Sequence, residues 1–510
     1  MSRLKRVLAE VRQLRKENAR LKKQLHERDQ QVVYLGQQNR KLRRQVWGRK
    51  SERTGGQKKT PAAARGAKPA KTSDQHKAKE KHGPKPFDPK LPRVKVKLPD
   101  PEPKDLICPL TGELMQPGFT ETIEVMEFIP ASIVIRRLER TWFVSSGKSA
   151  PVSTPWPDDI FARGRVHASV FGHLAAEHYS EHAPFARLEK KWERAGLRFP
   201  RATQVSLMQQ LNKMLQPAVG ALKDELMQQD YLHLDATPLP LCDPARPGGT
   251  VEATIWGYRA NDAPLVWYQF EYERGKSPAH PDRELKAANF QGLVQVDGAA
   301  GLSDLGVKGQ VVALGCMSHS RRYAFRAVEG GDLDAQVYLD GYNKIFKIDR
   351  LAKRFKFDAD KLHAWRLRYS LPIFDLLVAM AESEIDDVAP GTLLWDNLHY
   401  LIEQQEYLRR TIVIPGAELT NNSAERCLRP LKSGANNWLK IGHPKAGPRL
   451  ANLFTLVENC RQLGVNVEAY ITDLVTRLPG HPAKKIAELL PAAWKRAKEK
   501  LLAAADPSAA

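Results

Sequence analysis

The sequence predicts a multidomain α/β protein with a sheet in its central part. Short apolar runs rich in β-branched and aromatic residues recur between residues 229 and 330, with one helical stretch among them. From residue 331 to 410 the apolar residues follow helical spacing instead. The chain has 510 residues, and a single core usually stops growing near ~250–300 residues. We therefore expect several domains.

Charge divides the chain into two parts. Residues 1–100 hold 30 Lys and Arg against 9 Asp and Glu, whereas residues 101–510 hold 50 against 49. A basic arm on a nearly neutral body indicates a polyanion as partner, in the first place nucleic acid. The alternative is a solubilising tail. No apolar run approaches the ~18 residues of a membrane span, and no signal peptide is evident, so we expect a cytoplasmic protein.

Residues 1–47 follow an unbroken heptad pattern and predict a leucine-zipper-like coiled coil. Asparagine at two of the a positions favours a parallel, in-register homodimer. Arg28 and Gly36 weaken the middle, so a shorter coil is the alternative. The a positions are Leu4, Val11, Asn18, Leu25, Val32, Asn39 and Val46, and the d positions are Val7, Leu14, Leu21, Arg28, Leu35 and Leu42.

Three segments separate the coiled coil from the sheet. Residues 48–100 are rich in Lys, Pro, Ala and Gly and predict a flexible basic linker. Residues 101–160 alternate β-branched and polar residues, which predicts a β-ribbon. Residues 161–228 have helical spacing and predict either a helix-turn-helix that binds DNA or ordinary core helices.

The predicted elements of residues 229–330 have a distinctive order. The runs DYLHLDATPLPL, TIWGYRAN and PLVWYQFEY predict three strands, RELKAANF a helix, and GLVQVDGAAGL a fourth strand. This is the order of a ribonuclease H-like core, as in the retroviral integrase superfamily. Asp235 and Asp297 each stand at the predicted end of a strand, where a buried charge is costly unless it is paired or bound to metal. The alternative is that both aspartates cap turns.

A third carboxylate is expected on a helix beside the sheet. Glu425, in the run NNSAERCLRP, meets that requirement, although Glu418, Glu458 and Asp396 compete on spacing alone. Glu425 also suits a capping box with Asn422 at the N-cap, which is the alternative reading of this run. Three carboxylates would hold two Mg²⁺ or Mn²⁺ ions ~3.5–4 Å apart, the arrangement used in metal-dependent phosphoryl transfer.

These residues and their order resemble the DDE transposases of the insertion-sequence-66 (IS66) family. The similar stretches are LRRQVWGRKSER, HLDATP, LVQVDGAAGL, GCMSHSRRYAF, NNSAERCLRPLKSGANNWL and NVEAYITDLVTRLP. The resemblance implies a ribonuclease H-like catalytic core in two parts, 229–330 and 411–460, with a helical insertion at 331–410 between them. A C-terminal helical region at 461–510 would follow.

The resemblance also implies roles for single residues. Asp235, Asp297 and Glu425 would be the catalytic metal ligands, and Asn421 and Asn422 would shape the entry of the helix that carries Glu425. The candidate DNA contacts on and after that helix are Arg426, Arg429, Lys432, Trp438 and Lys440.

Cys316 and His319 form a C-x-x-H pair that could be half of a zinc site by spacing alone. No second pair accompanies it, so we expect these residues to organise the junction between core and insertion. The family commonly has paired cysteines in the ribbon at 101–160, whereas Cys108 stands alone there. The ribbon would thus resemble a zinc finger that has lost its ligands, and we do not expect zinc.

The sequence therefore predicts a transposase that cleaves and transfers DNA strands at the ends of a bacterial insertion sequence. Its expected partners are the element's ends, target DNA and a second copy of the chain, and accessory proteins of the same element are further candidates. It would act in the cytoplasm, associated with the nucleoid. The alternatives are a catalytically inactive, dimeric DNA-binding protein derived from a transposase, and a nuclease that cuts without joining.

Overall fold

The computed structural model describes residues 159–505, apart from 162–165, 247, 273–276, 278, 299–304, 306 and 308. The predicted coiled coil at 1–47 and the linker at 48–100 lie outside the described residues, as does the predicted ribbon up to residue 158. Within the described part, a short antiparallel pair, β1 (Ile160–Phe161) and β2 (Val166–His167), precedes the first helix.

A five-stranded mixed sheet lies at the centre of the described part, in the order β5-β4-β3-β6-β7. Neighbours β3, β4 and β5 are antiparallel, whereas β6 pairs parallel with both β3 and β7. The predicted order of three strands, a helix and a fourth strand is confirmed. The elements are β3 (Tyr231–Cys242), β4 (Thr250–Ala260), β5 (Val266–Glu271), α5 (Ala279–Ala287), β6 (Gly292–Gln295) and β7 (Val311–Leu314).

Strand β3 continues well past Asp235. Asp235 lies inside it, paired with Gly257 of β4, and the expectation that this aspartate ends its strand was wrong. Pro238 and Pro240 lie in this strand, and proline is tolerated where one side of a strand has no ladder partner. Strand β6 pairs only with Tyr231–His233, so this later part of β3 has β4 on one side and no β6 on the other.

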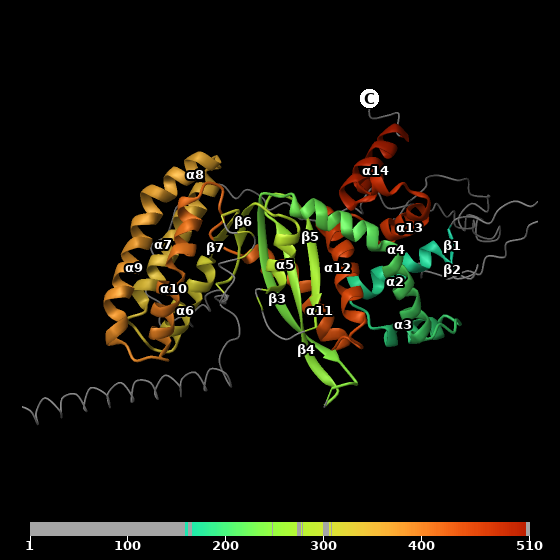
Figure 1. Cartoon of the computed structure of the whole chain (residues 1–510), viewed down its shortest axis with the longest axis horizontal. Coiled ribbons are helices and arrows are strands. Elements are labelled where there is room, and N and C mark those ends of the chain that lie inside the picture. The colour runs from blue at the N-terminus through green and yellow to red at the C-terminus, as the bar shows by residue number, and fades with distance from the viewer. Residues whose placement is uncertain are drawn as a thin grey trace, which may run out of the picture. The chain divides into compact units, whose positions relative to one another are not determined.

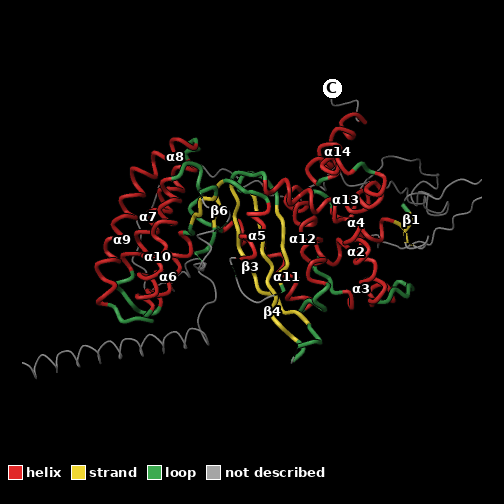
Figure 2. The backbone as a smooth tube through the Cα atoms, viewed as in Figure 1, coloured by secondary structure: helices red, strands yellow, loops and turns green. Residues whose placement is uncertain are grey.

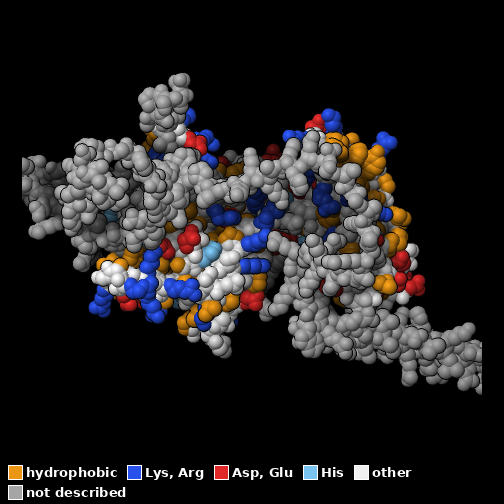
Figure 3. All heavy atoms as spheres, turned by 180° about the vertical axis from the view of Figure 1, so that it is seen from behind, with side chains coloured by type: hydrophobic (Ala, Val, Ile, Leu, Met, Phe, Trp, Pro, Cys, Tyr) orange, Lys and Arg blue, Asp and Glu red, His pale blue; other side chains and the backbone are white. Residues whose placement is uncertain are grey.

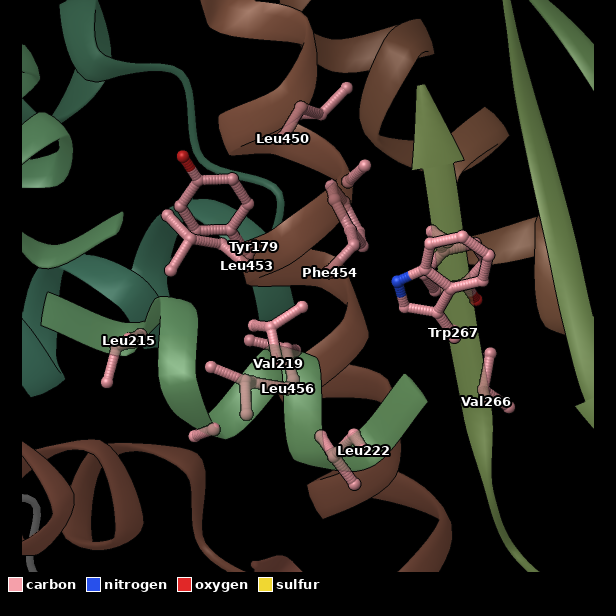
Figure 4. Close-up of a cluster of buried hydrophobic side chains, with 14 of the residues drawn as sticks. Tyr179, Leu215, Val219, Leu222, Val266, Trp267, Leu450, Leu453, Phe454 and Leu456 are labelled. Carbon is pink, nitrogen blue, oxygen red and sulfur yellow. The ribbon is translucent and has the colours of Figure 1, made fainter. Parts of the chain in front are cut away.

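One group of helices packs beside β5 (Figure 1, Figure 2). Figure 4 shows the buried cluster there, with side chains from α4, β5 and α12 facing one another. Helix α4 is thus a core helix, as one alternative for residues 161–228 predicted. The elements of this group are α2 (Ala168–Ala175), the π-helical turn η2 (Ala176–Ser180), α3 (Phe185–Arg194), α4 (Arg201–Met227), α12 (Ala446–Leu463), α13 (Val467–Arg477), the 3₁₀ turns at Leu478–Gly480 and Ala483–Leu489, and α14 (Pro491–Ala505).

Side chains of α12 bind the outer backbone of the edge strand β5. Asn459 accepts the backbone N–H of Val266 at 3.1 Å and donates to its carbonyl at 2.7 Å. Thr455 Oγ1 accepts the backbone N–H of Tyr268 at 3.0 Å. Both side chains are buried. An open sheet edge invites pairing with other chains, and here α12 occupies it.

A second group of helices lies beyond β7 and has its own buried cluster (Figure 1). The buried Arg366 binds Asp349 and the backbone carbonyls of Thr411 and Ala417. Its elements are α6 (Met317–Glu329), α7 (Gln336–Arg354), α8 (Ala359–Trp365), the π-helical turn at Arg366–Ser370, α9 (Leu371–Glu384), a 3₁₀ turn at Ile385–Asp387, and α10 (Leu393–Val413). None of the helices described has the length and apolar character needed to cross a membrane.

Candidate active site

Asp235 and Asp297 come from neighbouring parallel strands. The last residues paired between β3 and β6 are His233 and Gln295, and each aspartate lies two residues further along its own chain. Because neighbouring strands of a sheet lie about 4.7–4.9 Å apart, this register directs both aspartates to the same end of the β3–β6 pair. Asp235 Oδ1 accepts the N–H of Ala236 at 2.8 Å within the strand, which is not the turn cap considered above.

The turn after Asp297 requires glycine. Gly298 has φ +62°, a left-handed conformation, and a Cβ there would lie 2.6 Å from Tyr400 Oη of α10. Both features exclude larger side chains. Helix α10 therefore approaches the backbone directly beside Asp297.

Helix α11 (Asn422–Trp438) begins directly after a buried asparagine, Asn421, which binds β3. Asn421 donates from Nδ2 to the carbonyl of Leu234 at 2.7 Å, and its Oδ1 lies 3.0 Å from His233 Nδ1. Its backbone N–H is donated to Cys316 Sγ at 3.1 Å. Asn421 thus joins the start of α11 to β3 next to Asp235, and to the residue that precedes α6.

The capping-box reading of this run was wrong. The N-cap is Asn421, not Asn422, and its side chain makes no capping hydrogen bond. The reason is competition, because the Asn421 amide is used for contacts with β3. Asn422 is the first helical residue and is half-buried.

Glu425 faces α6 from the first turn of α11. Its Oε1 lies 3.7 Å from His319 Nε2 and 3.9 Å from Arg322 Nη2. These are charge contacts beyond hydrogen-bonding distance, and Oε1 is buried without a hydrogen-bond partner. Arg322 Nη1 lies 3.2 Å from His319 Nε2, so these two side chains form the wall that faces Glu425.

All three candidate carboxylates influence the pKa of His319. Burial lowers the pKa of His319 below its ordinary value, and Arg322 lowers it further. Asp297, Glu425 and Asp235 each oppose this effect and raise the pKa. Three carboxylates from β3, the turn after β6, and α11 therefore lie within electrostatic reach of one imidazole ring.

The three carboxylates are ligands of the type that a divalent ion prefers, but their side chains do not surround a common point. No group of three or more His, Cys, Asp or Glu side chains in the described part of the chain is arranged so that it could hold a metal ion. However, Mg²⁺ prefers carboxylate oxygens and keeps several waters, and the orphaned Oε1 of Glu425 is an acceptor of the required type.

The competing carboxylates are engaged elsewhere. Glu418 binds Lys353 at 2.9 Å, and Glu458 is buried in a pair with Arg461. Asp396 lies in the first turn of α10. None of these three is among the charges that act on His319.

Gly257 lets α11 approach the sheet beside Asp235. It is the β4 residue paired with Asp235, and a Cβ there would lie 2.9 Å from Leu428 Cδ2 and 3.3 Å from Cys427 Sγ. Both neighbours belong to α11. A glycine at this position thus sets the distance between the helix that carries Glu425 and the strand pair that carries Asp235.

Cys316 is a buried hydrogen-bonded thiol at the start of α6. Burial raises its pKa to about 11, so the thiol is protonated at neutral pH. Its contact with the N–H of Asn421 joins α6 to α11. His319 lies one turn into the same helix.

The predicted DNA contacts separate into two groups. Arg426, Arg429 and Lys432 are exposed on α11. Trp438 is half-buried, with its ring 6.0 Å from His178 and 6.3 Å from Phe454, so the structure gives it a packing role. Thirteen residues of helix separate Trp438 from Glu425, which is about 20 Å at 1.5 Å per residue. The exposed Lys440 lies beyond that, 3.4 Å from Thr250 Oγ1.

Sequence reasoning missed three residues of this site: Arg322, Gly257 and Gly298. Glycine after Asp297 was a readable signal, because an Asp-Gly pair favours turns with positive φ. Arg322 and Gly257 gave no such signal, since each matters only through a helix distant in the sequence.

Comparison with known proteins decides the family. A family model described as "Transposase IS66 family" matches residues 163–449. The chain belongs to this family. A model described as the IS66 C-terminal element matches residues 455–492 of this transposase-family chain, and one described as "Transposase C of IS166 homeodomain" matches residues 34–96.

Relatives of similar length occur in Sinorhizobium fredii. The protein y4hP is 23% identical over 506 residues, covering 91% of this chain and 89% of y4hP. The protein y4qI is 25% identical over 384 residues, covering 72% of this chain and 70% of y4qI. The similarity therefore extends well beyond the residues that carry the candidate site.

Proposed function

We propose that this protein is a DDE transposase that cleaves DNA at the ends of a bacterial insertion sequence and transfers the freed strands to target DNA. Its sheet would be the ribonuclease H-like core, and Asp235, Asp297 and Glu425 would be the catalytic carboxylates. The observation that carries the proposal is that Glu425 lies 3.7 Å from His319, beside the end of the parallel strand pair that carries the two aspartates. All three carboxylates raise the pKa of that histidine.

The three carboxylates would hold Mg²⁺ or Mn²⁺. Such ions, when bound, activate an attacking water or 3′-hydroxyl and stabilise the leaving oxygen of the phosphodiester. The protein would position these ligands: the parallel register of β3 and β6 would align the aspartates, and Asn421 holds the start of α11 against β3. Exposed arginines on α11 would balance the charge of the bound phosphates.

Arg322 and His319 have a supporting role in this proposal. Arg322 places a positive charge 3.9 Å from Glu425 Oε1. The lowered pKa of His319 keeps its ring neutral at neutral pH. The ring therefore adds no positive charge that would repel a metal ion. A coiled-coil homodimer, predicted for residues 1–47, would hold two DNA ends together.

The test is cleavage of a plasmid that carries the DNA flanking this coding sequence in its own genome, with Mg²⁺ or Mn²⁺. The wild-type protein should nick the element's ends and join them to a second plasmid. Asp235→Asn and Glu425→Gln should each lose detectable cleavage, because a neutral amide of the same shape is a poor ligand for a hard cation. Both variants should still bind the DNA.

Glu418→Gln is the matched control, since Glu418 competed with Glu425 on spacing and pairs with Lys353 instead. It should cleave like the wild type. Persistent cleavage by Asp235→Asn would overturn the assignment. DNA binding without any cleavage by the wild type would favour the inactive DNA-binding protein.

A further inference from the structure

A cleft of about 360 Å³ opens beside the candidate site, between α11, α12 and the end of η2 with the residues that follow it. We call it the arginine cleft, after Arg426 and Arg429 on its α11 wall and Arg461 on its α12 wall. Ser180 and His182 complete the second wall. Lys and Arg side chains also gather across the middle of the face drawn in Figure 3.

The cleft carries an excess of positive charge. Arg426 and Arg429 are exposed, and neither forms an ion pair with a carboxylate among the described residues. Arg461 is held by the buried Glu458 through two contacts, Nε to Oε2 at 2.7 Å and Nη2 to Oε1 at 2.6 Å. Three guanidinium groups therefore face one carboxylate, and that carboxylate orients Arg461 while leaving its third nitrogen for another acceptor.

His182 is an independent sign of a ligand. Its φ is +59°, a left-handed conformation that is uncommon for a residue with a side chain. Its Nδ1 is buried and has no hydrogen-bond partner, and its ring stacks on Phe454 with 6.1 Å between centroids. Burial lowers its pKa, so the ring is neutral and its buried nitrogen needs a polar partner. Strained backbone of this kind concentrates at functional sites.

Helix α11 links the cleft to the candidate site. Arg429 lies four residues after Glu425, and side chains at this spacing are neighbours on a helix, with Cβ atoms about 5–6 Å apart. A DNA strand whose reacting phosphate lies at Glu425 would therefore reach the cleft within a short distance along its backbone.

We propose that the arginine cleft binds a backbone phosphate of the DNA strand next to the reacting phosphate. Arg426 and Arg429 hold it from α11, and Arg461 and His182 hold it from the opposite wall. Guanidinium groups suit phosphate oxygens because their N–H donors match the spacing of two oxygens. The proposal rests on the proposed function, which supplies DNA as the ligand, and it adds the second wall.

The test measures binding of the full-length protein to fluorescein-labelled duplex DNA over a series of KCl concentrations. Each phosphate contact contributes about 0.9 to the slope of log K against log salt. Arg429→Gln should weaken binding and reduce this slope by about one. Arg350→Gln, which removes an exposed arginine from α7, is the matched control and should keep the wild-type slope.

The second wall is tested by the double variant Glu458→Gln/Arg461→Gln. It leaves the net charge unchanged and replaces the ion pair between buried Glu458 and Arg461 by two neutral amides, so diffuse electrostatics predicts no effect. A direct Arg461 contact instead predicts a slope reduced by about one. The triple variant with Arg429→Gln should lose less than the sum of the separate effects, because both walls hold one phosphate.

A wild-type slope in Glu458→Gln/Arg461→Gln, with a folded protein by circular dichroism, would overturn the cleft proposal. His182→Ala tests the same wall without changing the Glu458–Arg461 pair. This variant should also bind DNA more weakly than the wild type. The proposed function is judged separately: cleavage with unchanged slopes would overturn the cleft alone, whereas reduced slopes without any cleavage would overturn the function alone.

Discussion

The two edges of the sheet are covered by helices in different ways. At β5, the buried Asn459 and Thr455 of α12 bind the outer backbone through neutral side chains. At β7, Arg410 of α10 donates to the carbonyl of Ala313 at 3.1 Å, and the N–H of Gly315 binds the carbonyl of Tyr407 at 2.9 Å. The Arg410 side chain is 28% exposed and also forms an ion pair with Glu406.

The helices at the two edges differ in what they contact. The β5 edge is covered by buried, neutral side chains and adjoins the cluster in Figure 4. Helices beyond β7 have their own core and place His319, Arg322 and Tyr400 beside the carboxylates. We infer that the β5 edge mainly holds the sheet, whereas the β7 edge mainly shapes the candidate site.

The largest effect should come from Asn459→Leu. It removes the partner of both backbone groups of Val266 at a buried edge, and each orphaned group costs about 1–3 kcal/mol. The free energy of unfolding, measured by urea denaturation, should fall by roughly 2–6 kcal/mol.

Asn452→Leu is the control on the same helix, because among the described residues the Asn452 amide binds only another side chain, that of Asn212 at 3.0 Å. Its cost should be about 1 kcal/mol. Equal losses in the two variants would contradict the importance of the sealed edge.

Acid should weaken the β5 side through His178. Burial lowers the pKa of His178 from 6.5 to about 4. Below pH 6.5 the unfolded state gains a proton that the folded state does not accept until about pH 4, so stability is complete above 6.5 and falls as pH drops. The loss by pH 4 should be roughly 3 kcal/mol. His178→Gln should remove this part of the pH dependence of urea denaturation, and an unchanged pH profile would refute it.

Gly257→Val should separate the two strands of the site from α11. A side chain there meets Leu428, and such overpacking costs about 1–3 kcal/mol. Cleavage should fall more steeply than stability, because a displacement of about 1 Å at a catalytic group can cost ~10²-fold in rate. Gly220→Val on α4, where no atom lies within 4 Å of a built Cβ, is a control in open space and should retain cleavage.

Arg410→Gln should have the smallest effect, about 1 kcal/mol or less in unfolding free energy, because this arginine is partly exposed and its contact is screened by water. A loss as large as that of Asn459→Leu would mean that both edges contribute equally to stability, contrary to the comparison above.

The sequence predicted the strands around Asp235 and Asp297 because their apolar patterns are local. It placed Asp235 at the end of its strand, whereas β3 continues to Cys242 through pairing with β4, which the local pattern around Asp235 does not record. The start of α11 followed a tertiary contact of Asn421 instead of a local cap. His319 and Arg322 face Glu425 across about a hundred residues of sequence, and no local pattern records such a contact.

The most direct test of the account is Mn²⁺ binding measured by titration calorimetry on the full-length protein. The wild type should bind Mn²⁺, and Asp235→Asn, Asp297→Asn and Glu425→Gln should each weaken that binding at least tenfold, since the three carboxylates would form one site. Unchanged binding in any one of the three folded variants would show that its carboxylate lies outside the site and would contradict the account.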